Sequence, residues 1–169
     1  TFILSSKAGK QGYVQPVVEG DRYRFTVKVG APPEAAKNGT KLTRGANSGI
    51  ILRGQPEAPH ETALEIQVLD SHGRKPDTHS CGAVYDVVTP MFEVTRPPGE
   101  WNSYDIEFRG RHLVVVLNGW KIIDTDLGQM TMPIGKFDIP YAELPRQGFL
   151  FLQDHYREVW YRNILIRKL

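Results

Sequence analysis

Leu113-Val-Val-Val-Leu-Asn-Gly-Trp-Lys-Ile-Ile123 is the stretch of this sequence that indicates the fold most directly. Two apolar runs flank Asn118-Gly119, and an Asn-Gly pair readily adopts the two positive φ angles of a type I′ turn. The stretch therefore predicts two antiparallel strands, Leu113–Leu117 and Trp120–Asp124, joined by a two-residue turn.

Short strand patterns recur on both sides of this hairpin. Residues 22 to 29 alternate between polar and apolar side chains, a period of two that is typical of a half-buried strand. Turn-forming residues bound five further predicted strands, at Gly49–Arg53, Leu64–Leu69, Trp101–Arg109, Gly148–Gln153 and Val159–Arg167. No 3.6-residue period is sustained, and segments 90–98 and 130–145 are rich in proline. We therefore expect an all-β fold, a two-sheet antiparallel β-sandwich with little helix.

The length of 169 residues suits one domain, which we expect to span residues 1–169. Residues 31 to 47 follow neither periodicity and are rich in Pro, Gly, Ala, Lys and Asn, which predicts a long surface loop. The lone Cys81 excludes an internal disulfide and a cysteine-rich zinc site, and its simplest interpretation is a small buried apolar residue.

The charge balance excludes several classes of partner. The formal net charge is only +2, which indicates neither a nucleic-acid-binding stripe nor a polybasic membrane patch. No apolar run approaches the roughly 18 residues of a membrane span, so we expect a soluble chain. The chain opens at Thr1 rather than Met, which leaves earlier removal of a signal or of a longer N-terminal segment open.

A set of polar side chains is predicted to share one face of a sheet. In Leu64–Leu69 the apolar residues point one way while Glu65 and Gln67 point the other, and two further segments, 50–53 and 150–153, follow the same alternation. If these strands are adjacent, one polar surface collects Arg53, Glu65, Gln67, Gln153 and His155 beside the aromatic residues Tyr85 and Trp101. Polar groups suit sugar hydroxyls, and aromatic rings suit sugar C–H faces. Taken singly, each residue is as well explained as an ordinary outward-facing polar side chain.

At this point the chain resembles the 3-keto-disaccharide hydrolase domain family. The resemblance rests on segments in the family's order, namely Asn47-Ser-Gly-Ile-Ile-Leu-Arg53, Glu65-Ile-Gln-Val-Leu-Asp70, Cys81-Gly-Ala-Val-Tyr85, Gly99-Glu-Trp-Asn102, Leu117-Asn-Gly119, Leu152-Gln-Asp-His155 and Tyr161-Arg-Asn-Ile164. It implies a concanavalin A-like jelly roll, a role in bacterial glycan breakdown, and export to the periplasm, to the cell surface or out of the cell.

The chain also departs from the family pattern. Family members usually begin with further residues that contain a Gly-Trp and an early strand pair, whereas this chain opens directly at Thr1. The loop 31–47 and the insertion-like stretch 125–146 leave open whether this copy is catalytic or a degenerate binding module.

Ordinary glycosidases need two carboxyl groups roughly 5 to 9.5 Å apart. Same-face neighbours on one strand lie about 6.6 Å apart, but the neighbour of Glu65 is Gln67, an amide, and Asp70 lies on the other parity. This strand therefore cannot supply such a pair, although a carboxylate from a loop could complete one.

Chemistry on a 3-keto sugar, which the resemblance implies, needs only one base, because the ketone acidifies the proton at C2. We expect Glu65 and His155 to act as base and acid, in an order left open, with Arg53 and Gln67 or Gln153 polarising the ketone. Asp70 would orient His155 or help to hold a divalent cation; no ligand spacing demonstrates a metal site, so the cofactor is unknown. Tyr85 and Trp101 are the expected sugar-stacking rings, with core packing the alternative for Trp101.

Three functions follow from these features. The first is an enzyme that cleaves 3-keto-glycosides by elimination or hydrolysis after a partner oxidoreductase has made the ketone. The second is a non-catalytic carbohydrate-binding module, since one fold hosts many functions. The third is a structural subunit of an exported complex.

Overall fold

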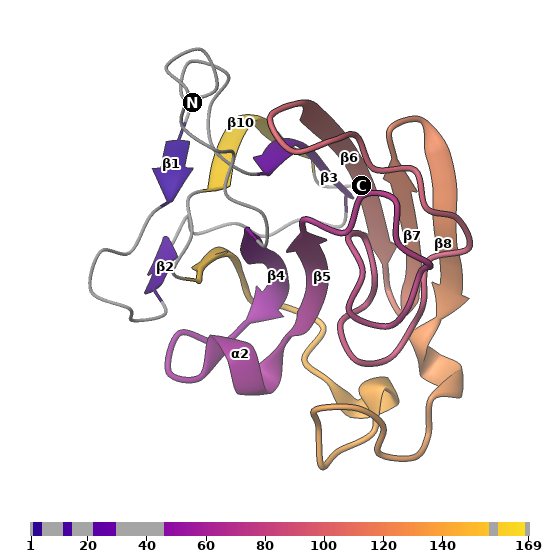
Figure 1. The fold of residues 1–169 in the computed structure, drawn as a ribbon. Coiled ribbons are helices and arrows are strands. Elements are labelled where there is room, and N and C mark those ends of the chain that lie inside the picture. Colours follow the sequence, from indigo (N-terminus) through magenta and orange to yellow (C-terminus); the bar gives the residue numbers. More distant parts are fainter. Residues whose placement is uncertain (1, 5–11, 15–21, 30–45, 156–158, 168–169) are drawn as a thin grey trace.

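The strands of the computed structural model form two antiparallel sheets, and the structure describes residues 2–4, 12–14, 22–29, 46–155 and 159–167 (Figure 1). The six-stranded sheet contains, in spatial order, β1 (Phe2–Leu4), β10 (Val159–Arg167), β3 (Arg22–Val29), β6 (Trp101–Arg109), β7 (His112–Leu117) and β8 (Trp120–Asp126). The four-stranded sheet contains β2 (Gly12–Val14), β9 (Phe149–Asp154), β4 (Asn47–Gly54) and β5 (Leu64–Leu69). The all-β sandwich expected from the sequence is confirmed.

The predicted hairpin is formed by β7 and β8. Asn118 and Gly119 have φ angles of 52° and 84°, the left-handed conformations that the Asn-Gly pair was expected to adopt. The Asn118 side chain also ties the turn to its surroundings: Oδ1 accepts a hydrogen bond from the Ser103 amide, and Nδ2 donates to the Val94 carbonyl and to Asn102 Oδ1. The turn residue therefore links the hairpin to β6 and to the loop before it.

Helix is minor in the described part of the chain, as expected. It consists of α2 (Pro59–Thr62) and the 3₁₀ turns η1 (Leu127–Gln129) and η2 (Tyr141–Glu143). Within the described ranges no helix has the length and apolar character of a transmembrane span. Residues 31–45 of the predicted long loop, and the side chains of β3, lie outside what the structure describes.

The main core lies between the sheets. The four-stranded sheet contributes Ile50 and Ile66, both fully buried, and β6 contributes alternate residues, so that Tyr104 and Ile106 face the same interior. Along β6 every second residue is buried, the period of two that is typical of a half-buried strand.

The outer face of the four-stranded sheet is buried as well. Ile51, Ala63 and Phe151 form a second apolar cluster there, on the opposite side of β4 from Ile50. Glu65 and Gln67, which pair with β4 residues of this outer face, are only 2% and 3% exposed. The sequence had predicted a solvated face, so this burial is a correction: periodicity reports which side chains share a face but not what covers it.

Replacing Asn118 with Ala is expected to lower the free energy of unfolding by about 1–3 kcal/mol, because three hydrogen bonds are lost and Ala is disfavoured at positive φ. Asn118→Gly loses the same bonds without the backbone cost and should be less destabilised. Urea unfolding of the three proteins measures both effects. An Asn118→Ala midpoint equal to that of the native chain would contradict this account of the turn.

Candidate active site

Neighbouring strands of the four-stranded sheet bring polar side chains together on its outer face. Gly49 of β4 pairs with Gln67 of β5, and Ile51 pairs with both Glu65 of β5 and Phe151 of β9. Gln153 lies two residues beyond Phe151 and therefore points to the same face. The structure thus brings Glu65, Gln67 and Gln153 to one surface, as the alternation predicted, and buries each of them almost completely.

The Glu65 carboxylate lies over Gly49. A Cβ added to Gly49 would sit 2.5 Å from Glu65 Oε1 and 3.0 Å from its Cδ, so a side chain at residue 49 cannot coexist with the observed position of Glu65. The Gly49 φ is not in the left-handed region, so it is this close approach, rather than backbone conformation, that requires glycine.

A lysine from a distant loop contacts this carboxylate. Lys136 Nζ donates a hydrogen bond to Glu65 Oε2 at 3.0 Å, and the Lys136 side chain is only 12% exposed. The ammonium also lies 5.6 Å from the centre of the Tyr85 ring and 5.2 Å from that of Phe137. Burial lowers the pKa of Lys136, and the charge of Glu65 acts in the opposite direction.

A histidine also lies against this carboxylate. His60 of α2 places Nδ1 3.4 Å from Glu65 Oε2, and this buried nitrogen makes no hydrogen bond to any described residue. The pKa of His60 is lowered, first by burial and then by the positive charge of Lys136, while Glu65 opposes the shift. His155 lies just past β9, and its charge adds a smaller lowering effect on the pKa of His60.

Tyr85 borders the site along the edge of β5. The amide of Tyr85 donates to the Glu65 carbonyl at 2.9 Å, and the amide of Gly82 donates to the Gln67 carbonyl at 2.8 Å, so residues 82–85 extend the sheet beyond β5. The Tyr85 ring is partly exposed, and burial together with the Glu65 charge raises the pKa of its hydroxyl. Tyr85 therefore lies beside Glu65, as expected from the sequence.

Arg53 points elsewhere. Its φ of 60° and the irregular pairing between Ile51 and Gly54 break the alternation of β4 at this residue. The guanidinium donates to the carbonyls of Gly110 and Phe108 at 2.6 and 2.9 Å and stacks 3.6 Å from the centre of the Phe108 ring. The expectation that Arg53 shares a surface with Glu65 is therefore corrected, because a bulge rather than a regular strand sets its direction.

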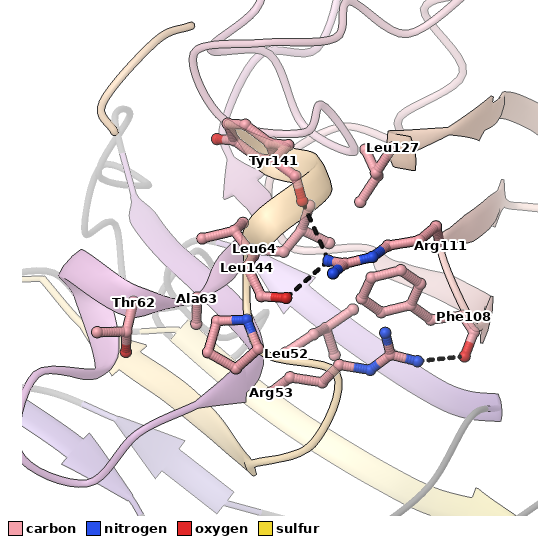
Figure 2. A pocket seen from close by; sticks show the side chains of 11 residues that line it. Leu52, Arg53, Thr62, Ala63, Leu64, Phe108, Arg111, Leu127, Tyr141 and Leu144 are labelled. Atoms are coloured by element: carbon pink, nitrogen blue, oxygen red, sulfur yellow. Dashed lines mark hydrogen bonds between the residues drawn. The ribbon is translucent and has the colours of Figure 1, made fainter. Parts of the chain in front are cut away.

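Arg53 instead lines a small pocket beside Arg111 (Figure 2). Arg111 donates to the carbonyls of Tyr141 and Leu144 at 3.2 and 2.6 Å, which anchors η2 to the sandwich. Figure 2 shows both guanidinium groups directed at backbone oxygens, and Leu52, Leu64 and Leu127 supply apolar walls. The arginines of this pocket therefore stabilise loop and strand ends.

Trp101 and Asp70 are also not brought to Glu65. Trp101 lies on the outer face of the six-stranded sheet, where its ring centre is 3.8 Å from the Arg162 guanidinium carbon. Asp70 follows β5 on the parity of the sandwich interior. On that side its carboxylate adds to the rise in the pKa of the Cys81 thiol that burial causes.

Within the described part of the chain, no three His, Cys, Asp or Glu side chains gather as a metal site.

Sequence reasoning missed His60, Lys136 and the role of Gly49. Lys136 is 71 residues from Glu65 along the chain and lies in the stretch 125–146 that looked like an insertion. No strand period links either His60 or Lys136 to Glu65, because both lie outside the sheets. The one available signal was Gly49, since a glycine inside a strand often marks a close approach.

The assembled groups suit proton transfer next to a carbonyl. Glu65 is a carboxylate base held on the buried outer face of the four-stranded sheet, Lys136 is a cation in contact with it, and His60 and His155 are imidazoles able to give or take a proton. Gln67 Oε1 is buried and has no hydrogen-bond partner among the described residues, so it can accept from a ligand hydroxyl.

The pKa of His60 should rise when Lys136 is replaced with Met. A positive charge beside an imidazole disfavours its protonated form, so removing the ammonium favours protonation. Titration of the His60 ring followed by NMR measures the shift. Lys121→Met is the matched control, because Lys121 pairs with Asp124 on the six-stranded sheet and should leave the His60 titration unchanged. A fall in the His60 pKa would contradict the placement of Lys136.

Gly49→Ala should destabilise the native chain by about 1–3 kcal/mol, the usual cost of overpacking, because the new Cβ collides with Glu65. In a Glu65→Ala background the colliding atoms are gone, so the same substitution should cost much less. A double-mutant cycle by urea unfolding measures this coupling. Equal costs in both backgrounds would show that Gly49 is required for another reason.

The chain is similar to known proteins in both sequence and fold. The sequence profile of the 3-keto-alpha-glucoside-1,2-lyase-like domain family matches residues 17–167. A 3-keto-disaccharide hydrolase of Bacteroides thetaiotaomicron is 26% identical over 162 residues, which cover 76% of this chain and 56% of that protein. The chain thus spans little more than half the length of this curated relative.

Solved structures share the fold. A candidate glycosyl hydrolase from Parabacteroides distasonis superposes with a TM-score of 0.79 and 28% identity, covering 99% of this chain and 87% of that one. The carbohydrate-binding module CBM66 of Bacillus subtilis superposes with a TM-score of 0.51 and 10% identity, covering 96% and 89%, and shows the fold alone. From the profile match over residues 17–167, the chain belongs to the 3-keto-alpha-glucoside-1,2-lyase-like domain family.

Proposed function

We propose that this chain cleaves 3-keto-glycosides by an elimination that Glu65 starts as the base. The observation that carries the proposal is the carboxylate itself, which is 2% exposed and lies 3.0 Å from the Lys136 ammonium and 3.4 Å from a His60 nitrogen. The buried amides of Gln67 and Gln153 lie on the same face as this carboxylate. A carboxylate in such a setting is equipped to remove a proton from a sugar bound there.

The reaction requires one base and one acid. Glu65 takes the proton from C2, which the neighbouring ketone acidifies, and the electron pair of that C–H bond forms an enolate with C3 and the ketone oxygen. As the enolate collapses, a double bond forms between C1 and C2, the C1–O bond breaks, and the departing oxygen takes a proton from His155, which lies two residues beyond Gln153, just past β9. Addition of water to the resulting enone completes a net hydrolysis.

The elimination needs one carboxylate as its base, which agrees with the carboxylates that β5 presents on this face. The neighbour of Glu65 on the same face is Gln67, an amide, so the strand provides one carboxylate rather than the pair that a double displacement needs. Gln67 and Gln153 are buried on that face and are proposed to bind sugar hydroxyls, with Tyr85 at the edge.

The family and the relatives support the substrate class. The B. thetaiotaomicron relative is named for hydrolysis of 3-keto-disaccharides, and we extend that substrate class to this chain. A partner oxidoreductase is proposed to supply the ketone, and export to the periplasm or cell surface is proposed as the setting in which the two act in sequence.

Turnover of a 3-keto-glucoside beside its unoxidised parent tests the proposal. The native chain should cleave only the keto sugar, and Glu65→Gln should lower kcat at least 100-fold, the usual loss when a general base is removed. His155→Ala should lower it as well. Glu107→Gln is the matched control, because Glu107 pairs with Arg109 on the six-stranded sheet and should leave turnover unchanged.

The other outcomes separate the alternatives. Binding of the sugar without cleavage of either compound would indicate a carbohydrate-binding module. Neither binding nor cleavage would indicate a structural role. Loss of turnover on addition of a chelator would show that a divalent cation takes part.

A further inference from the structure

We propose that Lys136 is a further catalytic residue, whose ammonium binds the C3 ketone oxygen and stabilises the enolate formed when C2 loses its proton. The inference rests on the proposed elimination and assigns a group that the base and the acid do not supply. Without a positive charge or hydrogen-bond donor at that oxygen, the negative charge that develops there would be poorly stabilised in a buried site.

The contact between Lys136 and Glu65 matches the geometry of the reacting atoms. The ketone oxygen and the acidic proton belong to adjacent carbons, so a base and a cation in direct contact can reach both at once. Nζ lies 3.0 Å from Oε2 of the carboxylate that takes the proton. One sugar bound across this pair meets the base at C2 and the ammonium at the oxygen of C3.

The Lys136 ammonium has N–H groups available for a ligand. A lysine ammonium carries three N–H groups, and in the described part of the chain its one hydrogen bond goes to Glu65. The side chain is 12% exposed, so a ketone oxygen bound there is largely shielded from water, and the attraction between cation and enolate is correspondingly stronger. The rings of Tyr85 and Phe137, 5.6 and 5.2 Å away, border the group without accepting a conventional hydrogen bond.

The loop that carries Lys136 is held close to the Tyr85 segment by two left-handed residues. Gly135 has φ 64°, and a Cβ there would lie 2.8 Å from the Asp86 carbonyl oxygen and 3.2 Å from its carboxylate. Asp86 itself has φ 66°. The two backbones therefore approach as closely as a glycine allows, which fixes Lys136 beside Tyr85 before a substrate arrives.

The same cation explains selection of the keto sugar. In the unoxidised parent, C3 carries a hydroxyl, the C2 proton is not acidic, and no negative charge develops on the C3 oxygen. An ammonium at this position therefore favours the reaction only when a ketone is present, because its contribution appears in the transition state.

Exchange of the C2 proton separates enolate formation from bond cleavage. A 3-keto-1,5-anhydroglucitol has no exocyclic leaving group at C1, so in D₂O the native chain should exchange its C2 proton without releasing an alcohol, which NMR measures. Lys136→Met should slow both this exchange and the cleavage of a 3-keto-glucoside at least 100-fold. Lys136→Arg keeps a cation and should restore part of both rates. Lys121→Met, which removes a lysine paired with Asp124 at 2.6 Å on the other sheet, should change neither.

Three results would overturn the inference while leaving the proposed function intact. In the first, Lys136→Met exchanges and cleaves at native rates. In the second, it exchanges the C2 proton at the native rate and loses only the cleavage of the 3-keto-glucoside. In the third, Lys136→Met recovers full rates of exchange and cleavage at higher pH. The last would mean that Lys136 acts through the base rather than at the ketone oxygen. Thermal unfolding of each variant separates a lost catalytic group from a lost fold, with Lys136→Arg as the second variant. A native chain that neither exchanges nor cleaves would instead refute the proposed elimination, and the inference with it.

Discussion

The hydrogen bond between Lys136 and Glu65 joins two charged side chains that are 12% and 2% exposed, and the candidate site depends on it. Removing either charge from water costs several kcal/mol, a cost that a close partner offsets only when the geometry is good. A fold selected for stability alone would place apolar residues here. Glu65 keeps its position because Gly49 leaves the space over which it lies, and Lys136 keeps its position because Gly135 lets its loop pack against Asp86.

The sandwich supports this arrangement by burying both faces of the four-stranded sheet. Ile50 and Ile66 face the core between the sheets, while Ile51 and Phe151 form an apolar cluster on the outer side. Glu65, Gln67 and Gln153 lie on that covered outer face, where charges interact strongly and water is largely excluded. The B. subtilis carbohydrate-binding module has a similar fold, so the catalytic assignment rests on these side chains rather than on the architecture.

Two predicted site residues show where strand periodicity stops being informative. Arg53 stands at the right parity for the polar face, but a bulge with a φ of 60° turns it to the carbonyls of Phe108 and Gly110. Trp101 opens a correctly predicted strand, yet that strand belongs to the six-stranded sheet, and the ring faces away from the four-stranded one. A period of two specifies which residues of one strand share a face; it specifies neither the sheet to which the strand belongs nor a local change of register.

The sequence by itself determined the all-β class, most strand bounds, the Asn118-Gly119 turn and the shared face of Glu65, Gln67 and Gln153. These features depend on local conformation and on alternation within a strand, both of which neighbouring residues specify. Only the tertiary structure decided that the polar face is buried and that His60 and Lys136 meet Glu65. Those contacts join a short helix, a loop and a strand that are distant in the chain, and they form only when packing of the two sheets fixes where each connection ends.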